Sequence, residues 1–226
     1  MSPPRPGNNY SIIIPDLCGM GETAVDSEVF YFSDEITKAA FCFQLGTSMY
    51  QFRVSNLLTL ISSIKNKYKS SKIHLLGDSL SKYNPKVIRQ NRLLIDKGLD
   101  ELHIAESIGP MITMFTAALS NDISSCVLLS PLSDFKDIFE SHYFYHMMSI
   151  FPHGILKHMN TTEIFSLISP INLLIANPVN GRNQLITKNN FKITSKLYKL
   201  YRKNGNRIQV KFNGFQDIQR FFSDQK

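Results

Sequence analysis

Short apolar runs alternate with longer stretches of helical periodicity along most of the chain. Each apolar run is bounded by polar or turn residues, which is typical of strands that are buried on both faces of a sheet. The runs predict strands at residues 11–15, 72–76, 101–105, 125–129, 171–176 and 207–212.

Between these runs, apolar residues recur at spacings of three and four, which predicts helices. One of them would begin with Asn84 as its N-cap and Pro85 in the first turn. The predicted helices are residues 50–64, 84–97, 109–119, 162–168, 188–203 and 215–222. Strands that alternate with helices favour a three-layer α/β/α domain with a mostly parallel sheet.

Residues 133–160 break this alternation. The segment is rich in aromatic residues and histidines, and it is expected to be a cap-like excursion over the sheet. No linker of Pro, Gly or Ser divides the chain, so residues 1–226 are expected to form a single domain.

The composition narrows the class of protein. A length of 226 residues suits one domain with a sizeable core, and 43% hydrophobic residues exclude a disordered chain. The apolar runs are much shorter than the roughly 20 residues that span a bilayer. Cys18, Cys42 and Cys126 have no metal-binding or disulfide spacing, so we expect reduced thiols in a cytoplasmic protein. We predict no cofactor, no metal, no nucleic-acid partner and no membrane partner.

The formal net charge is +7, and part of the positive charge is concentrated in residues 188–203. Five lysines recur at spacings of three and four, which predicts that they share one face of the helix at 188–203. They are Lys188, Lys192, Lys196, Lys199 and Lys203. A solvated helix face is the simpler interpretation, and binding to an acidic partner stays a weaker hypothesis.

A candidate catalytic motif lies where the strand predicted at 101–105 meets the next helix. Small residues, Ala105 and Gly109, flank Ser107 two positions before and two positions after it. They would let the strand turn sharply into the helix and expose the Ser107 hydroxyl at the helix N-terminus. The backbone N–H of Ile108 could then stabilise an oxyanion.

This Ala-x-Ser-x-Gly turn resembles the nucleophile elbow of the α/β-hydrolase family, in detail the acetylxylan-esterase and dienelactone-hydrolase-like branch. The flanks carry the resemblance further, with Pro15-Asp16 and a Gly-x-Gly pair upstream and a strand introduced by Pro170 downstream. The resemblance implies an α/β-hydrolase fold that lacks its first strands and its oxyanion loop. The chain would then be a shortened member, or part of a larger chain or assembly.

Two positions depart from the family's catalytic triad. The acid position holds Asn180 and the histidine position holds Phe215. A serine without a base is a poor nucleophile, and loss of a triad member lowers kcat by about 10⁴-fold. We therefore predict a hydrolase-like domain with impaired or lost catalysis. The alternative is an active serine esterase that acts on a small-molecule ester, with Asp134 and a histidine of residues 142–158 as acid and base.

A rival turn, Gly77-Asp78-Ser79, also follows a predicted strand. It lacks a second small residue after the serine, so we interpret Ser79 as an ordinary turn residue. Residues 72–100 would then be an inserted strand and helix.

Overall fold

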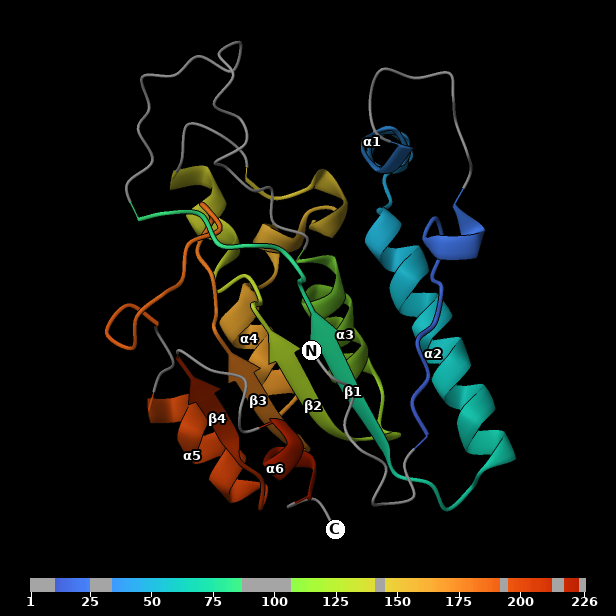
Figure 1. The fold of residues 1–226 in the computed structure, drawn as a ribbon, viewed down its shortest axis with the longest axis vertical. Coiled ribbons are helices and arrows are strands. Elements are labelled where there is room, and N and C mark those ends of the chain that lie inside the picture. Colours follow the sequence, from blue (N-terminus) through green and yellow to red (C-terminus); the bar gives the residue numbers. More distant parts are fainter. Residues whose placement is uncertain are drawn as a thin grey trace.

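The fold is α/β, and the described residues form a sheet of four parallel strands in the order β1-β2-β3-β4 (Figure 1). The computed structural model describes residues 11–24, 34–86, 107–140, 145–191, 195–212 and 218–223. The strands are β1 (Ile73–Asp78), β2 (Ile123–Leu129), β3 (Asn172–Ala176) and β4 (Ile208–Lys211). Four of the six predicted strands are thereby confirmed within a residue or two at each end.

Helices flank the sheet on both faces. The larger set has α3 (Ile108–Leu119), α4 (Thr161–Leu167) and α5 (Ser195–Lys203) on one face, with α2 (Met49–Lys67) packed against α3. The opposite face carries α6 (Ile218–Ser223). α1 (Asp34–Gln44) packs on α2 and on the 3₁₀ helix η4. The 3₁₀ helices are η1 (Gly21–Thr23), η3 (Phe135–Glu140), η4 (Met148–Ile150) and η5 (Ile155–Lys157).

The pleat of β2 divides its side chains between the two faces. Cys126 and Leu128 pack in the cluster formed with the larger helix set, whereas Val127 and Leu129 pack with Phe221 of α6. All four strand residues are essentially buried. Because both faces are covered, the strand is apolar at consecutive positions rather than at alternate ones, which is why its sequence predicted a parallel sheet.

α3 lies unusually close to β1. A Cβ on Gly77 would come within 2.5 Å of the backbone oxygen of Gly109 and within 2.5 Å of Thr113 Oγ1, and a Cβ on Gly109 would collide with the backbone of Asp78. Only glycine leaves room for this approach. The two glycines therefore fix the start of α3 against the carboxyl end of β1.

The segment that precedes α1 is not part of the sheet, so the strand predicted at 11–15 is wrong. Ile12, Ile13 and Ile14 are 63%, 56% and 88% exposed. The chain is attached to α2 instead, because the Cys18 N–H donates to Asn56 Oδ1 and the Cys18 carbonyl accepts from Arg53 Nε. An apolar run forms a strand only when a neighbouring strand supplies its hydrogen bonds.

A buried ion pair holds α1 to α2. Arg53 is fully buried and donates from both terminal nitrogens to the two carboxylate oxygens of Glu35, each at 2.6 Å. Burial alone would raise the pKa of Glu35, but the hydrogen bonds and charge of Arg53, together with Ser149 and the charge of Lys38, outweigh burial and hold this pKa below its usual value. The guanidinium thus joins α2, α1 and the Cys18 loop at one point.

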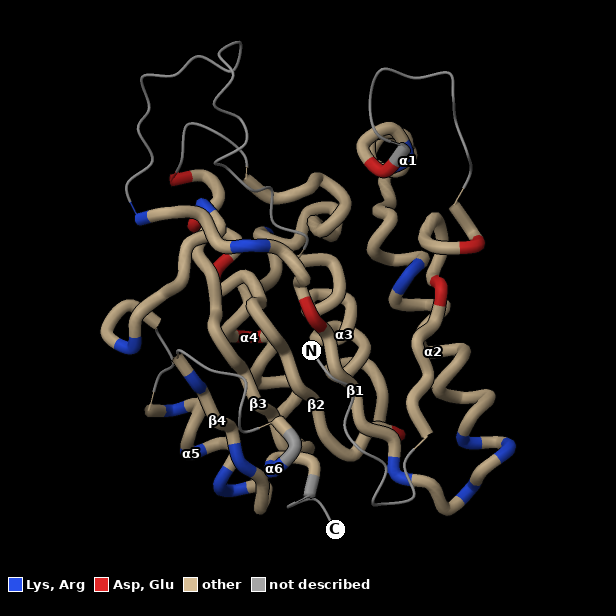
Figure 2. The backbone as a smooth tube through the Cα atoms, viewed as in Figure 1, with Lys and Arg blue, Asp and Glu red and all other residues tan. Residues whose placement is uncertain are grey.

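The predicted lysine face is wrong at its first residue. Lys188 lies in a turn in which the Thr187 carbonyl accepts from the N–H groups of Asn190 and Phe191, and α5 begins only at Ser195. Lys192 lies outside the described residues. Figure 2 shows the other basic residues of this region, drawn in blue, along α5.

The helix predicted at 84–97 and the strand predicted at 101–105 fall largely or wholly outside the described residues. Residues 84–86 are not helical, so Asn84 is not the N-cap of a helix that begins there; the rest of the helix predicted at 84–97 lies outside the described residues, as does the strand predicted at 101–105. The Asn84 side chain donates to the Arg182 carbonyl instead. The contact with Arg182, which is distant in the sequence, outweighs the local preference of Asn84-Pro85 for a helix start.

We predict that Gly77→Ala lowers the free energy of unfolding by about 2–3 kcal/mol, because the new methyl group meets the backbone of α3. Urea denaturation measures this. Gly46→Ala is the matched control, since its Cβ would meet nothing within 4 Å and only its left-handed φ of +71° costs about 1 kcal/mol. Equal losses in the two variants would contradict the close contact of α3 and β1.

We predict that Glu35→Gln lowers the free energy of unfolding by about 3 kcal/mol at pH 7, because it leaves the Arg53 charge buried without its partner. A carboxylate with a lowered folded pKa stabilises the fold above its unfolded pKa of about 4.5, and this stabilisation is lost as the pH falls through the folded value. The difference between wild type and variant should therefore shrink below about pH 4.5. The exposed Glu140→Gln serves as control and should change stability by less than about 0.5 kcal/mol throughout.

Candidate functional site

Strained backbone marks the carboxyl edge of the sheet. Leu80 follows β1, Ser130 follows β2 and Asn177 follows β3, and their φ angles are +55°, +54° and +51°. Left-handed conformations at residues other than glycine are costly and concentrate at functional sites. In a parallel sheet the carboxyl ends of the strands meet at one edge, which is where α/β folds place their ligands. This edge is therefore the first place to look for chemistry.

Ser107 lies at this edge, at the N-cap of α3, with a fully buried side chain. Its Oγ is 3.4 Å from Nδ1 of His146, a histidine of the predicted excursion. The carbonyl of Ser107 accepts from the Met111 N–H and so begins the helix. The nucleophile position and a histidine are thus brought together from positions 39 residues apart.

The tautomer of His146 follows from its second hydrogen bond. Nε2 lies 3.0 Å from the backbone oxygen of Asn180, and a carbonyl can only accept, so Nε2 carries the proton. Nδ1 is then free of a proton and accepts from the Ser107 hydroxyl. This arrangement is a serine, a base and a group that orients the base, as in a catalytic triad, but with the two ring nitrogens exchanged relative to the serine-protease pattern.

Burial lowers the pKa of His146 to about 4, although the hydrogen bond to the Asn180 carbonyl opposes the shift. The side chain is only 4% exposed. The imidazole is therefore neutral at pH 7 and able to accept a proton. Its low basicity makes that transfer much less favourable than transfer to a base whose pKa is near 7.

Asn180 supplies no charge to this array. Its side-chain oxygen accepts from the backbone N–H groups of Arg182 and Gln184, which fixes the turn after β3. Its backbone carbonyl faces His146. A neutral carbonyl orients the ring, but it stabilises an imidazolium less than the carboxylate of a triad does.

Residues 79–86 cross the carboxyl edge after leaving β1 (Figure 1). The hydroxyls of Tyr83 and Ser130 share a hydrogen bond of 2.7 Å at the end of β2. The Asn84 N–H donates to the Asn183 carbonyl, and Asn183 Nδ2 donates back to the Lys82 carbonyl. These bonds tie the segment to the turn that carries Asn180.

The excursion packs into the core from the other side of the same turn. Phe135, Ile138 and Ile150 are fully buried. Gly181 approaches the backbone of Asp137 so closely that a Cβ at residue 181 would collide with its carbonyl. The turn at Asn180 is therefore held between residues 79–86 and η3.

The other predicted site residues have different places. Asp134 Oδ1 accepts from the Lys136 N–H and from Nδ2 of Asn160, the N-cap of α4, so the structure joins Asp134 to α4 and not to His146. Ile108 is the first residue of α3. Phe215 lies outside the described residues.

The glycine pair changes the interpretation of Ser79. The turn Gly77-Asp78-Ser79 lacks a second small residue in the sequence, but the fold places Gly109 against Gly77 and Asp78. Ser79 is 2% exposed, and the left-handed residue is Leu80 rather than the serine. Sequence reasoning missed this pair and the Asn180 carbonyl, because neither contact has a local sequence signal.

Within the described residues, no group of three or more His, Cys, Asp and Glu side chains could hold a metal ion. No helix in the described part of the chain is long and apolar enough to cross a membrane. No model of a known protein family matches the chain, and neither does a curated protein or a solved structure. The parallel α/β sheet is thus shown without a family assignment.

We predict that His146 makes stability depend on pH between about 4 and 6.5. Its folded pKa of about 4 lies below the usual 6.5, so the unfolded chain binds more protons in this range and stability falls as the pH is lowered. The wild type should lose up to about 3 kcal/mol that His146→Gln does not lose. Urea denaturation at several pH values measures the difference.

His158→Gln is the control for this effect, because His158 is exposed. It should keep the wild-type dependence on pH. The same dependence in His146→Gln as in the wild type would show that His146 is not buried in the neutral form.

Proposed function

We propose that this chain is an α/β-hydrolase-like domain, related to carboxylic-ester hydrolases, in which catalysis is impaired. The observation that carries the proposal is the buried contact of Ser107 with His146, in which a backbone carbonyl takes the place of the triad acid. The pair has the parts of a serine-hydrolase site but lacks the charge that makes such a site fast. The substrate class would be a small-molecule ester, and no cofactor is required.

Three features support impaired catalysis. The base is weak because burial lowers the pKa of His146 to about 4. The orienting group is the neutral Asn180 carbonyl, and loss of the triad acid lowers kcat by about 10⁴-fold in serine proteases. The nucleophile is fully buried, so a substrate cannot reach Ser107 without movement of the chain around it.

An active serine esterase is the second candidate, and the Ser107–His146 distance favours it. In that mechanism Ser107 Oγ attacks the ester carbonyl while its proton passes to His146 Nδ1, and the Ile108 N–H stabilises the oxyanion. His146 returns the proton to the departing alcohol. Water then hydrolyses the acyl-enzyme by the reverse use of the same base.

Cytoplasmic location belongs to the same proposal. Cys18, Cys42 and Cys126 are all free thiols, which supports a reducing compartment. Participation in a larger chain or assembly is also part of the proposal.

Fluorophosphonate labelling and hydrolysis of p-nitrophenyl acetate test the two candidates on the full chain. If catalysis is impaired, wild type and Ser107→Ala differ in ester turnover by less than about tenfold, and the probe does not label Ser107 to completion. Ser79→Ala is the matched control, because it removes a second buried hydroxyl at the same edge.

Complete labelling that Ser107→Ala abolishes, together with a loss of turnover of about 10³-fold or more, would reject impaired catalysis and support the active esterase. In that case His146→Gln should lose as much turnover as Ser107→Ala, because the two residues act as a unit. Labelling that disappears only in Ser79→Ala would contradict both candidates, because each places Ser107 at the nucleophile position.

A further inference from the structure

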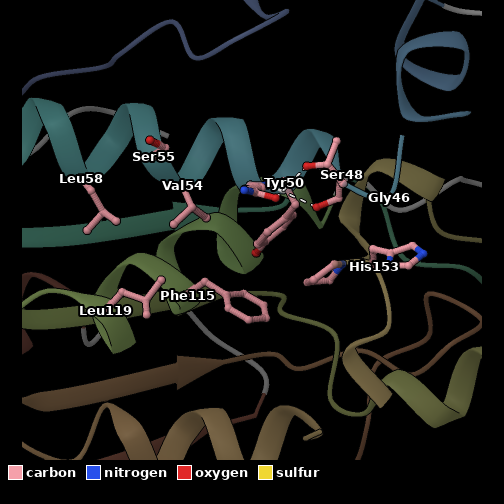
Figure 3. A pocket seen from close by; sticks show the side chains of 12 residues that line it. Gly46, Ser48, Tyr50, Val54, Ser55, Leu58, Phe115, Leu119 and His153 are labelled. Carbon is pink, nitrogen blue, oxygen red and sulfur yellow. Dashed lines mark hydrogen bonds between the residues drawn. The ribbon is translucent and has the colours of Figure 1, made fainter. Parts of the chain in front are cut away.

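A cavity of about 410 Å³ lies between α2 and α3, away from Ser107 (Figure 3). Its walls come from the loop before α2, from the first part of α2, from the last turns of α3 and from residues 152–153. This volume is in the range of small-molecule sites. The site does not depend on the proposed function, because it uses the end of α3 opposite to Ser107.

Tyr50 lines this cavity and carries a buried hydroxyl at its edge. Its side chain is 2% exposed, and its hydroxyl has no hydrogen-bond partner within the described parts of the chain. The ring contacts Phe115 edge to face at 5.0 Å, and Figure 3 shows Tyr50 pointing from α2 towards α3. A buried hydroxyl without a partner is unfavourable, so a ligand acceptor at this point would restore a missing hydrogen bond.

One end of the cavity is apolar. Val54 and Leu58 of α2 face Phe115 and Leu119 of α3 across it, and Leu119 is 64% exposed. These side chains form a continuous hydrocarbon wall between the two helices. This end suits an alkyl chain, because burial of such a chain removes apolar surface from water on both sides.

The other end of the cavity is polar and favours an anion. Thr47, Ser48 and Gln51 lie at the start of α2, where the helix dipole is positive, and the first turn holds no acidic residue. His153 lies across from them, and no Asp or Glu lines the cavity. The helical rise separates the two ends by about 16 Å between Thr47 and Leu58.

We propose that this cavity binds the anion of a medium-chain fatty acid. The alkyl chain lies along Val54, Leu58 and Leu119, the carboxylate lies towards the start of α2, and the Tyr50 hydroxyl donates to a ligand oxygen. The polar end, the apolar end and the unpartnered hydroxyl together account for one amphiphile with a single acidic head group.

Isothermal titration calorimetry of the full chain tests the proposal with decanoate below its micelle concentration. Decanol and decyltrimethylammonium carry the same chain with a neutral and a cationic head group. Decanoate should bind saturably and at least tenfold more tightly than either. A tighter complex with decyltrimethylammonium, or no saturable binding of decanoate, would overturn the proposal.

Variants locate the binding to this cavity. Tyr50→Phe removes only the unpartnered hydroxyl and should weaken decanoate binding about tenfold, without loss of stability in the free protein. Tyr68→Phe changes an exposed tyrosine at the end of α2 and should bind as the wild type does. Leu119→Gln changes an exposed residue, so it should fold, and it should weaken binding by shortening the apolar wall. Decanoate binding unchanged in both Tyr50→Phe and Leu119→Gln would overturn the proposal.

Discussion

The close backbone contact between β1 and α3 is the constraint on which the rest of the structure depends. Gly77 and Gly109 lack side chains at the point where the strand and helix touch, and any larger residue would force them apart. With α3 at this distance, Met111 and Met114 are fully buried in the main core. The same contact brings the N-cap residue, Ser107, to the carboxyl edge of the sheet. The position of α3, the burial of its side chains in the core and the place of Ser107 thus all depend on the contact between Gly77 and Gly109.

Polar contacts at that edge then decide what the site can do. The turn at Asn180 holds His146 by a backbone carbonyl, and residues 79–86 are hydrogen bonded to the same turn. These hydrogen bonds join the chain that leaves β1 to the turn that follows β3, and Ser107 is fully buried at the same edge. The burial of Ser107 at this edge is one of the observations that support the proposal of impaired catalysis. The cavity between α2 and α3 has the opposite character, because it is lined by Tyr50, whose buried hydroxyl has no partner within the described part of the chain.

Much of the fold could be predicted from the sequence where a pattern is local. β2 and β3 are apolar at consecutive positions because both of their faces are covered, and α3 has the small and apolar residues of a buried helix. The segment at 11–15 has the same apolar pattern, yet it joins no strand, and the chain just after it is attached to α2 through the hydrogen bonds of Cys18 with Arg53 and Asn56. Lys188 likewise has helical spacing from its neighbours but lies in a turn. Periodicity cannot distinguish these cases, since pairing partners are distant in the sequence.

The sequence by itself determined the α/β class, the place of most strands and helices, and Ser107 as a serine at a helix start. The tertiary structure alone decided that His146 is the histidine beside Ser107, that Asn180 contacts it through its carbonyl, and that Asp134 accepts from Asn160, the N-cap of α4. It also decided that Gly109 completes the contact with Gly77. The physical reason is the range of the interactions. Strand and helix propensity act over a few neighbouring residues, whereas hydrogen bonds and close packing join residues that only the folded chain brings together.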